Sequence, residues 1–195
     1  AYMFSGANNF NGDISNWVIE SVTNTRKMFY NAPEFNQDIS GWATEKVTDM
    51  SGMFYDAAKF NKILLKWNVE NVTTFANMFK GATDLLKIWN PHLSNNTTPT
   101  KPFFSTSITQ ANIKPSADLW TNYVTIATEA YGDISGWVTT NITDMSGLFK
   151  DISTFNSDIT NWNTSAVTTM TSMFENASGF NQDISGWNTA QVRTM

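Results

Sequence analysis

The sequence lacks cysteine, and its 195 residues include a single histidine, His92. The absence of cysteine excludes a disulfide framework and thiolate chemistry. With one histidine, no Ser-His, Cys-His or zinc-ligand arrangement can be assembled. A glycine-rich phosphate-binding loop is also absent. These absences favour a protein that is not an enzyme, and they leave no candidate catalytic, cofactor-binding or metal residue.

Charge is also scarce. Charged residues make up 15% of the chain, against roughly 25% in an average domain. The formal net charge is −5, which argues against nucleic acid as a partner because nucleic-acid binding calls for a basic face. No apolar run approaches the roughly 18 residues of a membrane span, so we expect no membrane insertion within this segment.

Internal repetition is what the sequence has in abundance. The block from Phe35 to Trp42 recurs from Phe180 to Trp187. Further copies run from Phe10 to Trp17, from Phe60 to Trp67 and from Phe155 to Trp162. The first phenylalanines of successive blocks lie 25 residues apart, as at positions 10, 35 and 60. A fixed period of this length is typical of a repeat array.

The pattern inside one repeat predicts its local structure. Phe-Asn-x-Asp-Ile-Ser alternates apolar and polar residues, which is typical of a short strand. Val-Thr-x-Met is β-branched and suits a second extended piece. Met-x-x-Met-Phe-x-x-Ala places apolar residues on one face of a short helix. We therefore predict a repeat solenoid that resembles leucine-rich repeats, in which each 25-residue coil has one or two short β-strands and a short helical turn. Stacking of coils should align Phe10, Phe35 and Phe60 in one buried column.

The repeat frame breaks in the middle of the chain, at a polar stretch punctuated by prolines. We predict a first array over residues 1–89, a polar linker over 90–107, a helical cap over 108–129 and a second array over 130–195. The cap would cover the open end of the second core. Because the chain starts and ends within a repeat, we expect it to be part of a longer array.

The framed residues resemble a known family. Asp-Ile-Ser-x-Trp, followed by Val-Thr-x-Met-x-x-Met-Phe-x-x-Ala-x-x-Phe-Asn-Gln, is similar to the repeat of the BspA-type leucine-rich-repeat surface proteins, which include a repeat first catalogued as a mycoplasma protein of unknown function. The similarity covers roughly residues 1–88 and 130–195. It implies a leucine-rich-repeat-like solenoid that is displayed on a cell or particle surface and binds other molecules.

Residues at equivalent positions should form ladders along each stack. The asparagine amides can satisfy the backbone inside a turn, and tryptophans at a fixed apolar phase are usually core. An exposed tryptophan row would instead offer a platform for sugars. The aspartates could hold a row of calcium ions, but one carboxylate per coil is few for an ion that takes about six to eight oxygen ligands. We favour structural roles and no cofactor. The ladder residues are Asn36, Asp38, Trp42, Asn156, Asp158, Trp162, Asn181, Asp183 and Trp187.

The residues that follow each tryptophan vary while their surroundings stay constant. Loops on a rigid scaffold often carry binding, so these positions are candidates for a partner-binding strip that needs no metal. The alternative is that they are plain solvated loops. The strip residues are Glu45, Lys46, Glu70, Asn71, Thr140, Asn163, Thr164 and Asn188.

Two functions remain open. The first is a non-enzymatic, surface-displayed repeat protein that acts as an adhesion or protein/glycan interaction module. The alternative is a structural spacer or a self-assembling subunit of an extracellular filament or virion. The expected partner is a protein or glycan on another surface, or copies of the chain itself, and the expected location is extracellular or on a cell or virion surface.

Overall fold

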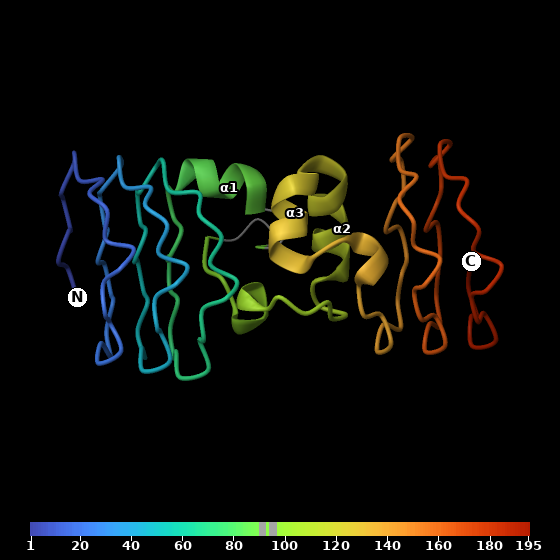
Figure 1. Ribbon diagram of the computed structural model, residues 1–195, viewed down its shortest axis with the longest axis horizontal. Coiled ribbons are helices and arrows are strands. Elements are labelled where there is room, and N and C mark those ends of the chain that lie inside the picture. The colour runs from blue at the N-terminus through green and yellow to red at the C-terminus, as the bar shows by residue number, and fades with distance from the viewer. Residues whose placement is uncertain (90–92, 94–96) are drawn as a thin grey trace. The chain divides into compact units, whose positions relative to one another are not determined.

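The structure is a computed structural model that describes residues 1–89, 93 and 97–195. The chain divides into two compact units, Ala1–Ser105 and Thr106–Met195. In each unit, successive coils lie side by side, coloured blue to green in the first and orange to red in the second (Figure 1). None of the helices in the described residues is long and apolar enough to cross a membrane.

The expectation of a strand-containing, leucine-rich-repeat-like solenoid is wrong. Across the described ranges the coils hold no strand, and isolated parallel bridges join neighbouring repeats, as from Asn24 to Asp49 and from Asp49 to Thr74. The extended pairing stops there because tight turns lie on either side. The N–H of Val47 donates to the carbonyl of Thr44 at 2.9 Å before the bridge, and that of Met53 donates to Met50 at 3.2 Å after it.

The expected helical turn around each Met-Phe pair is wrong as well. Two residues before the phenylalanine, Lys27, Gly52 and Asn77 have φ angles of +53°, +59° and +54°. A left-handed residue interrupts a right-handed helix. The N–H of Phe29 therefore donates to the carbonyl of Met53 in the next repeat, at 2.9 Å. Hydrogen bonds in this segment run between repeats as well as within them.

Stacked phenylalanine rings form the core of each unit. The rings of Phe10 and Phe35 lie 5.9 Å apart, and those of Phe35 and Phe60 also lie 5.9 Å apart, so the three rings form the predicted column. Phe35 and Phe60 are buried as predicted, whereas Phe10 is half-buried. Phe29 stacks on Phe35 within one repeat at 3.8 Å and on Phe54 of the next at 5.7 Å. Burial of one such ring contributes roughly 1.5–3 kcal/mol. The coil backbone is thus held by a periodic apolar interior.

The first unit ends in helix α1, Thr83–Trp89, and the 3-10 helix η1, Lys101–Phe104. Sequence analysis did not predict α1. Phe103 and Phe104 of η1 are buried, and their rings lie 5.6 Å from Phe79 and 5.2 Å from Phe75. Residues 97–105 therefore belong to the first unit and do not form a separate linker. Residues 106–107 of the predicted linker open the second unit, and residue 93 is buried. The remaining residues of the predicted linker, 90–92 and 94–96, lie outside the described residues.

The second unit begins with α2, Ile113–Asn122, then α3, Val124–Tyr131, and the 3-10 helix η2, Ile134–Gly136. Gln110, just before α2, forms hydrogen bonds with the first coil of the second unit. Its Oε1 accepts from the N–H groups of Thr143 and Asp144 at 2.8 and 3.0 Å. One coil later, the N–H of Thr168 bonds instead to the carbonyl of Thr143, at 2.8 Å. Gln110 thus takes the place of a preceding coil.

Candidate functional site

All residues of the predicted strip except Thr164 are exposed. Among them Glu45, Lys46, Glu70 and Thr140 carry the side chains that no hydrogen bond of the turn engages in the described part of the chain. They come from the turn that follows each tryptophan. In the first unit this turn is fixed to the next coil, because the side-chain amide of Asn71 donates to the carbonyl of Glu45 at 2.7 Å. Charged side chains are therefore displayed on an ordered backbone.

Thr164 does not belong to the strip, which corrects the prediction. Its side chain is 2% exposed, and its hydroxyl donates to the carbonyl of Asn188 at 3.0 Å. Thr44 and Thr139 are buried in the same way and bond to Asn68 and Asn163 at 2.9 and 3.0 Å. A β-branched residue two positions after the tryptophan is thus a core position that joins one coil to the next.

Two asparagines of the strip are exposed but already engaged. Oδ1 of Asn163 accepts from the N–H and the hydroxyl of Ser165 at 3.0 and 2.7 Å. Oδ1 of Asn188 accepts from the N–H of Ala190 at 3.0 Å. These amide oxygens fold the turn on which they lie, so their replacement would disturb the strip's backbone as well as its surface.

The aspartate ladder also folds turns. Oδ1 of Asp158 accepts from the N–H and the hydroxyl of Thr160 at 2.9 and 2.6 Å, and Asp38 and Asp183 accept in the same way from the N–H of the residue two positions on, at 2.9 Å. The hydrogen bond from the Thr160 hydroxyl contributes most to lowering the pKa of Asp158 below its usual value, and the bond from the Thr160 backbone N–H contributes next. No group of three His, Cys, Asp or Glu side chains in the described part of the chain could hold a metal ion.

Tryptophans of the ladder lie in the core. Trp42 and Trp162 are 4% and 3% exposed, and each indole N–H donates to a carbonyl in the preceding repeat, that of Ile14 at 3.1 Å and that of Ile134 at 2.8 Å. Trp187, in the last repeat, is half-buried. The rings therefore pack between coils and offer no sugar platform at these positions.

The asparagine ladder joins coils at the start of each block. Oδ1 of Asn36 accepts from the N–H of Asn61 at 3.2 Å, and Oδ1 of Asn156 accepts from the N–H of Asn181 at 2.9 Å. The side-chain amide of Gln182 adds a bond to the carbonyl of Asn156 at 3.0 Å. These amides satisfy backbone donors of the next coil, so they are structural elements of the stack.

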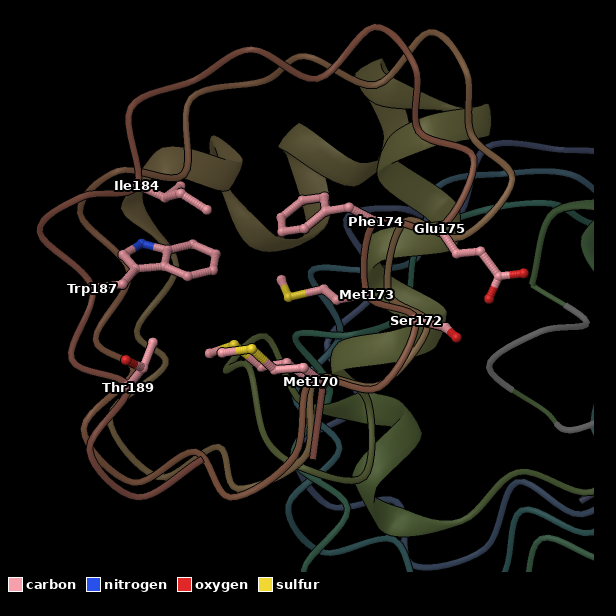
Figure 2. Close-up of a pocket in the computed structure, with 9 residues that line it drawn as sticks. Met170, Ser172, Met173, Phe174, Glu175, Ile184, Trp187 and Thr189 are labelled. Atoms are coloured by element: carbon pink, nitrogen blue, oxygen red, sulfur yellow. The ribbon is translucent and has the colours of Figure 1, made fainter. Parts of the chain in front are cut away.

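A hollow of about 510 Å³ opens on the last repeat. Figure 2 shows Met173, Phe174 and Trp187 pointing into it, while Ser172 and Glu175 point away. In the preceding repeat, the ring of Phe149 is covered by Phe174 at 5.7 Å. The hollow is therefore an open face of the apolar core. It lacks the converging polar groups that orient a small substrate.

Sequence reasoning missed a surface feature of the first unit. Tyr30 and Tyr55, each directly after a Met-Phe pair, stack at 4.6 Å beside a groove. Their spacing of 25 residues was a usable signal. Gln110 carried no such signal, because it lies outside the repeat frame.

Comparison with known proteins places the chain in a family. A family described as Mycoplasma protein of unknown function, DUF285, matches residues 1–115 and 119–195. The chain belongs to this family. No curated protein matches the chain, and no solved structure matches it.

The DUF285 match spans both units and every repeat described above. The residues that recur at fixed positions of the repeat are core rings, carboxylates that fold turns, and amides that join one coil to the next. What the arrangement offers chemically is therefore hydrogen bonding and charge on its outer surface, from residues that the core does not constrain.

Proposed function

We propose that the protein is a non-enzymatic, surface-displayed interaction module, related to the BspA-type surface proteins, that binds a protein or glycan on another surface. The proposal rests on the difference, within each repeat, between residues that hold the stack together and residues that are exposed. Frame residues are buried or bonded between coils, whereas Glu45, Lys46, Glu70 and Thr140 are exposed on an ordered turn. Residues free of core constraint on a rigid scaffold are where binding is commonly placed.

The proposal is tested with an alanine variant of Glu45, Lys46 and Glu70. The probes are an array of neutral and acidic glycans and a surface coated with extracellular-matrix protein. A control variant replaces Glu34, Lys59 and Asp84 by alanine. It removes the same two negative charges and one positive charge from exposed ion pairs elsewhere in the first unit.

We expect the strip variant to bind roughly 30-fold to 150-fold more weakly, because it loses two or three interfacial contacts of about 1 kcal/mol each. The control variant should bind like the unmodified chain. Equal losses in both variants, or no binding of the unmodified chain to either surface, would contradict the proposal.

A further inference from the structure

A groove of about 410 Å³ crosses three successive repeats of the first unit. One repeat contributes Lys27 and Tyr30, the next Gly52 and Tyr55, and the third Thr74. The groove is lined by polar and charged groups as well as by ring carbon, and it lies on a different part of the repeat from the strip. Its long direction therefore runs along the stack of repeats.

The groove exists because Gly52 has no side chain. The equivalent positions of the neighbouring repeats hold Tyr2, Lys27 and Asn77. A Cβ atom at Gly52 would lie 3.3 Å from Cγ of Lys27 and 3.9 Å from a ring carbon of Tyr30. The missing side chain therefore leaves a floor of bare backbone between a lysine and two tyrosine rings.

Two ammonium groups are held at the tyrosines. The rings of Tyr30 and Tyr55 stack at 4.6 Å with 22° between their planes. Nζ of Lys27 lies 4.6 Å from the centre of the Tyr30 ring, and Nζ of Lys80 lies 5.3 Å from that of Tyr55. Attraction between a cation and an aromatic ring keeps each charge in place while it stays accessible to a ligand.

The charge around the groove is unbalanced. Among the described residues, no carboxylate lies in ion-pair distance of Arg26, Lys27 or Lys80. Asp49, the acidic residue of the lining, already accepts from the N–H and the hydroxyl of Ser51, at 2.8 and 2.5 Å. Arg26 and Lys27 therefore exceed Asp49 by one positive charge in the lining, and Lys80 lies beside it at the Tyr55 ring. On a chain with a net charge of −5, this local excess of positive charge attracts anions.

The second unit provides an internal comparison. Gly147 occupies the position of Gly52 and also has a left-handed φ, +61°. However, Lys150 stands where the first unit has Tyr55, and its Nζ pairs with Glu175 at 2.9 Å. The same repeat positions thus carry tyrosines and cations outside ion pairs in the first unit, and an ion pair without tyrosines in the second.

We propose that the groove of the first unit binds an acidic polysaccharide. Its sulfate or carboxylate groups pair with Lys27 and Lys80, and its hydroxyls face Ser51 and Thr74 across the floor at Gly52. A linear chain with repeated negative charges can reach Arg26 and Lys27 of one coil and also Lys80 two coils on, at the Tyr55 ring. This inference rests on the proposed interaction function and names the ligand class for one surface.

The test measures binding of the chain to immobilised dextran sulfate, carboxymethyl dextran and unmodified dextran, with inorganic polyphosphate as a non-sugar polyanion. One variant combines Lys27→Gln with Lys80→Gln. A second, Gly52→Asn, fills the floor with the residue that the next repeat holds at the same backbone conformation, Asn77. Gly147→Asn is the matched control.

We expect the unmodified chain to bind one or both acidic dextrans, and unmodified dextran and polyphosphate far more weakly. Loss of the two lysines should weaken binding by roughly tenfold per residue, as for a charge-assisted hydrogen bond. Gly52→Asn should weaken binding with an unchanged melting temperature, and Gly147→Asn should not. Added salt should weaken binding as well.

Three outcomes would overturn the inference: no binding to either acidic dextran, equal binding to polyphosphate, or equal effects of Gly52→Asn and Gly147→Asn. Each leaves the proposed function standing if the variant of Glu45, Lys46 and Glu70 still loses binding to its surface. If that variant binds normally while the groove variants fail, the strip is wrong and the groove is right.

Discussion

At the scale of single residues, the sequence predicted the ladders well because their roles follow from periodicity. A tryptophan or asparagine that returns every 25 residues meets its equivalent in the next coil, and a role in stacking is the simplest outcome. Thr164 was misassigned because the four residues after each tryptophan were treated as one variable stretch. The second of them is Ile19, Thr44 or Val69 in other repeats, and all three are buried. Constant β-branching was the missed signal.

Trp162→Ala should lower the free energy of unfolding by about 3–5 kcal/mol, as for other buried tryptophans. The ring is 3% exposed, and its N–H bonds to the carbonyl of Ile134, which would lose that donor. Urea denaturation followed by circular dichroism measures the change. Trp17→Ala is the control, because Trp17 is 38% exposed and should cost much less. An unchanged midpoint for Trp162→Ala would show that this ring does not contribute to the core.

Acid should destabilise the protein through the aspartate ladder. The hydrogen bonds of the turn hold the pKa values of Asp133, Asp158 and Asp183 below the usual value. A folded-state pKa below the unfolded-state pKa gives stability that is present above the unfolded value and is lost as the pH falls through the folded one.

The melting temperature should therefore fall as the pH is lowered from about 5 to about 3. Asp158→Asn should reduce this dependence, because the amide cannot ionise but can still accept from Thr160. Thermal melts at a series of pH values measure the slope. A slope that is the same in Asp158→Asn and in the unmodified chain would show that this turn contributes nothing to acid sensitivity.

At the scale of elements, sequence patterns located the repeats but misjudged their backbone. Alternation of apolar and polar residues predicts a strand only if pairing extends over several residues, and here turns close on both sides of a single bridge. The left-handed residue before each Met-Phe pair is lysine at position 27, glycine at 52 and asparagine at 77. A lysine in the sequence does not indicate a left-handed conformation, so the apolar spacing predicted a helical turn that does not form. Helix α1 was missed because it lies where the repeat frame fades.

Gln110→Ala should weaken the start of the second unit by about 1–2 kcal/mol. Its side chain accepts from the N–H groups of Thr143 and Asp144 and donates to the carbonyl of Asp144, and solvent can reach all three backbone groups. Hydrogen exchange gives a sharper readout. The amides of Thr143 and Asp144, which donate to Gln110, should lose protection. Gln182→Ala is the control, because its side chain donates to Asn156 and leaves Thr143 untouched. Unchanged protection at Thr143 in Gln110→Ala would show that the cap does not hold this coil.

At the scale of the whole molecule, the sequence indicated two repeat segments with a helical insertion between them. The boundary was displaced because the polar composition of residues 90–107 hides Phe103 and Phe104, which are buried in the first unit. Two aromatic residues after a proline were read as part of a linker, although they cover the last coil. Composition averages over such short apolar pairs, whereas packing depends on them.

Both the strip and the groove require that equivalent residues of successive repeats are neighbours. The most direct test of this claim uses the absence of native cysteine. Thr23, Thr48 and Thr73 are exposed. The backbone N–H of Thr48 donates to the carbonyl of Thr23, and that of Thr73 donates to the carbonyl of Thr48, each at 2.8 Å. Neighbouring extended segments are about 4.8 Å apart, within the Cα range of about 4.4–6.8 Å that a disulfide spans.

The measurement is the yield of intramolecular disulfide, by mass spectrometry at low protein concentration under mild oxidation. The pair Thr48→Cys with Thr73→Cys should cross-link nearly completely. The pair Thr23→Cys with Thr73→Cys has an intervening coil between its members and should not cross-link. Equal yields in the two pairs, or no disulfide in the first, would contradict the account of coils stacked in a 25-residue register.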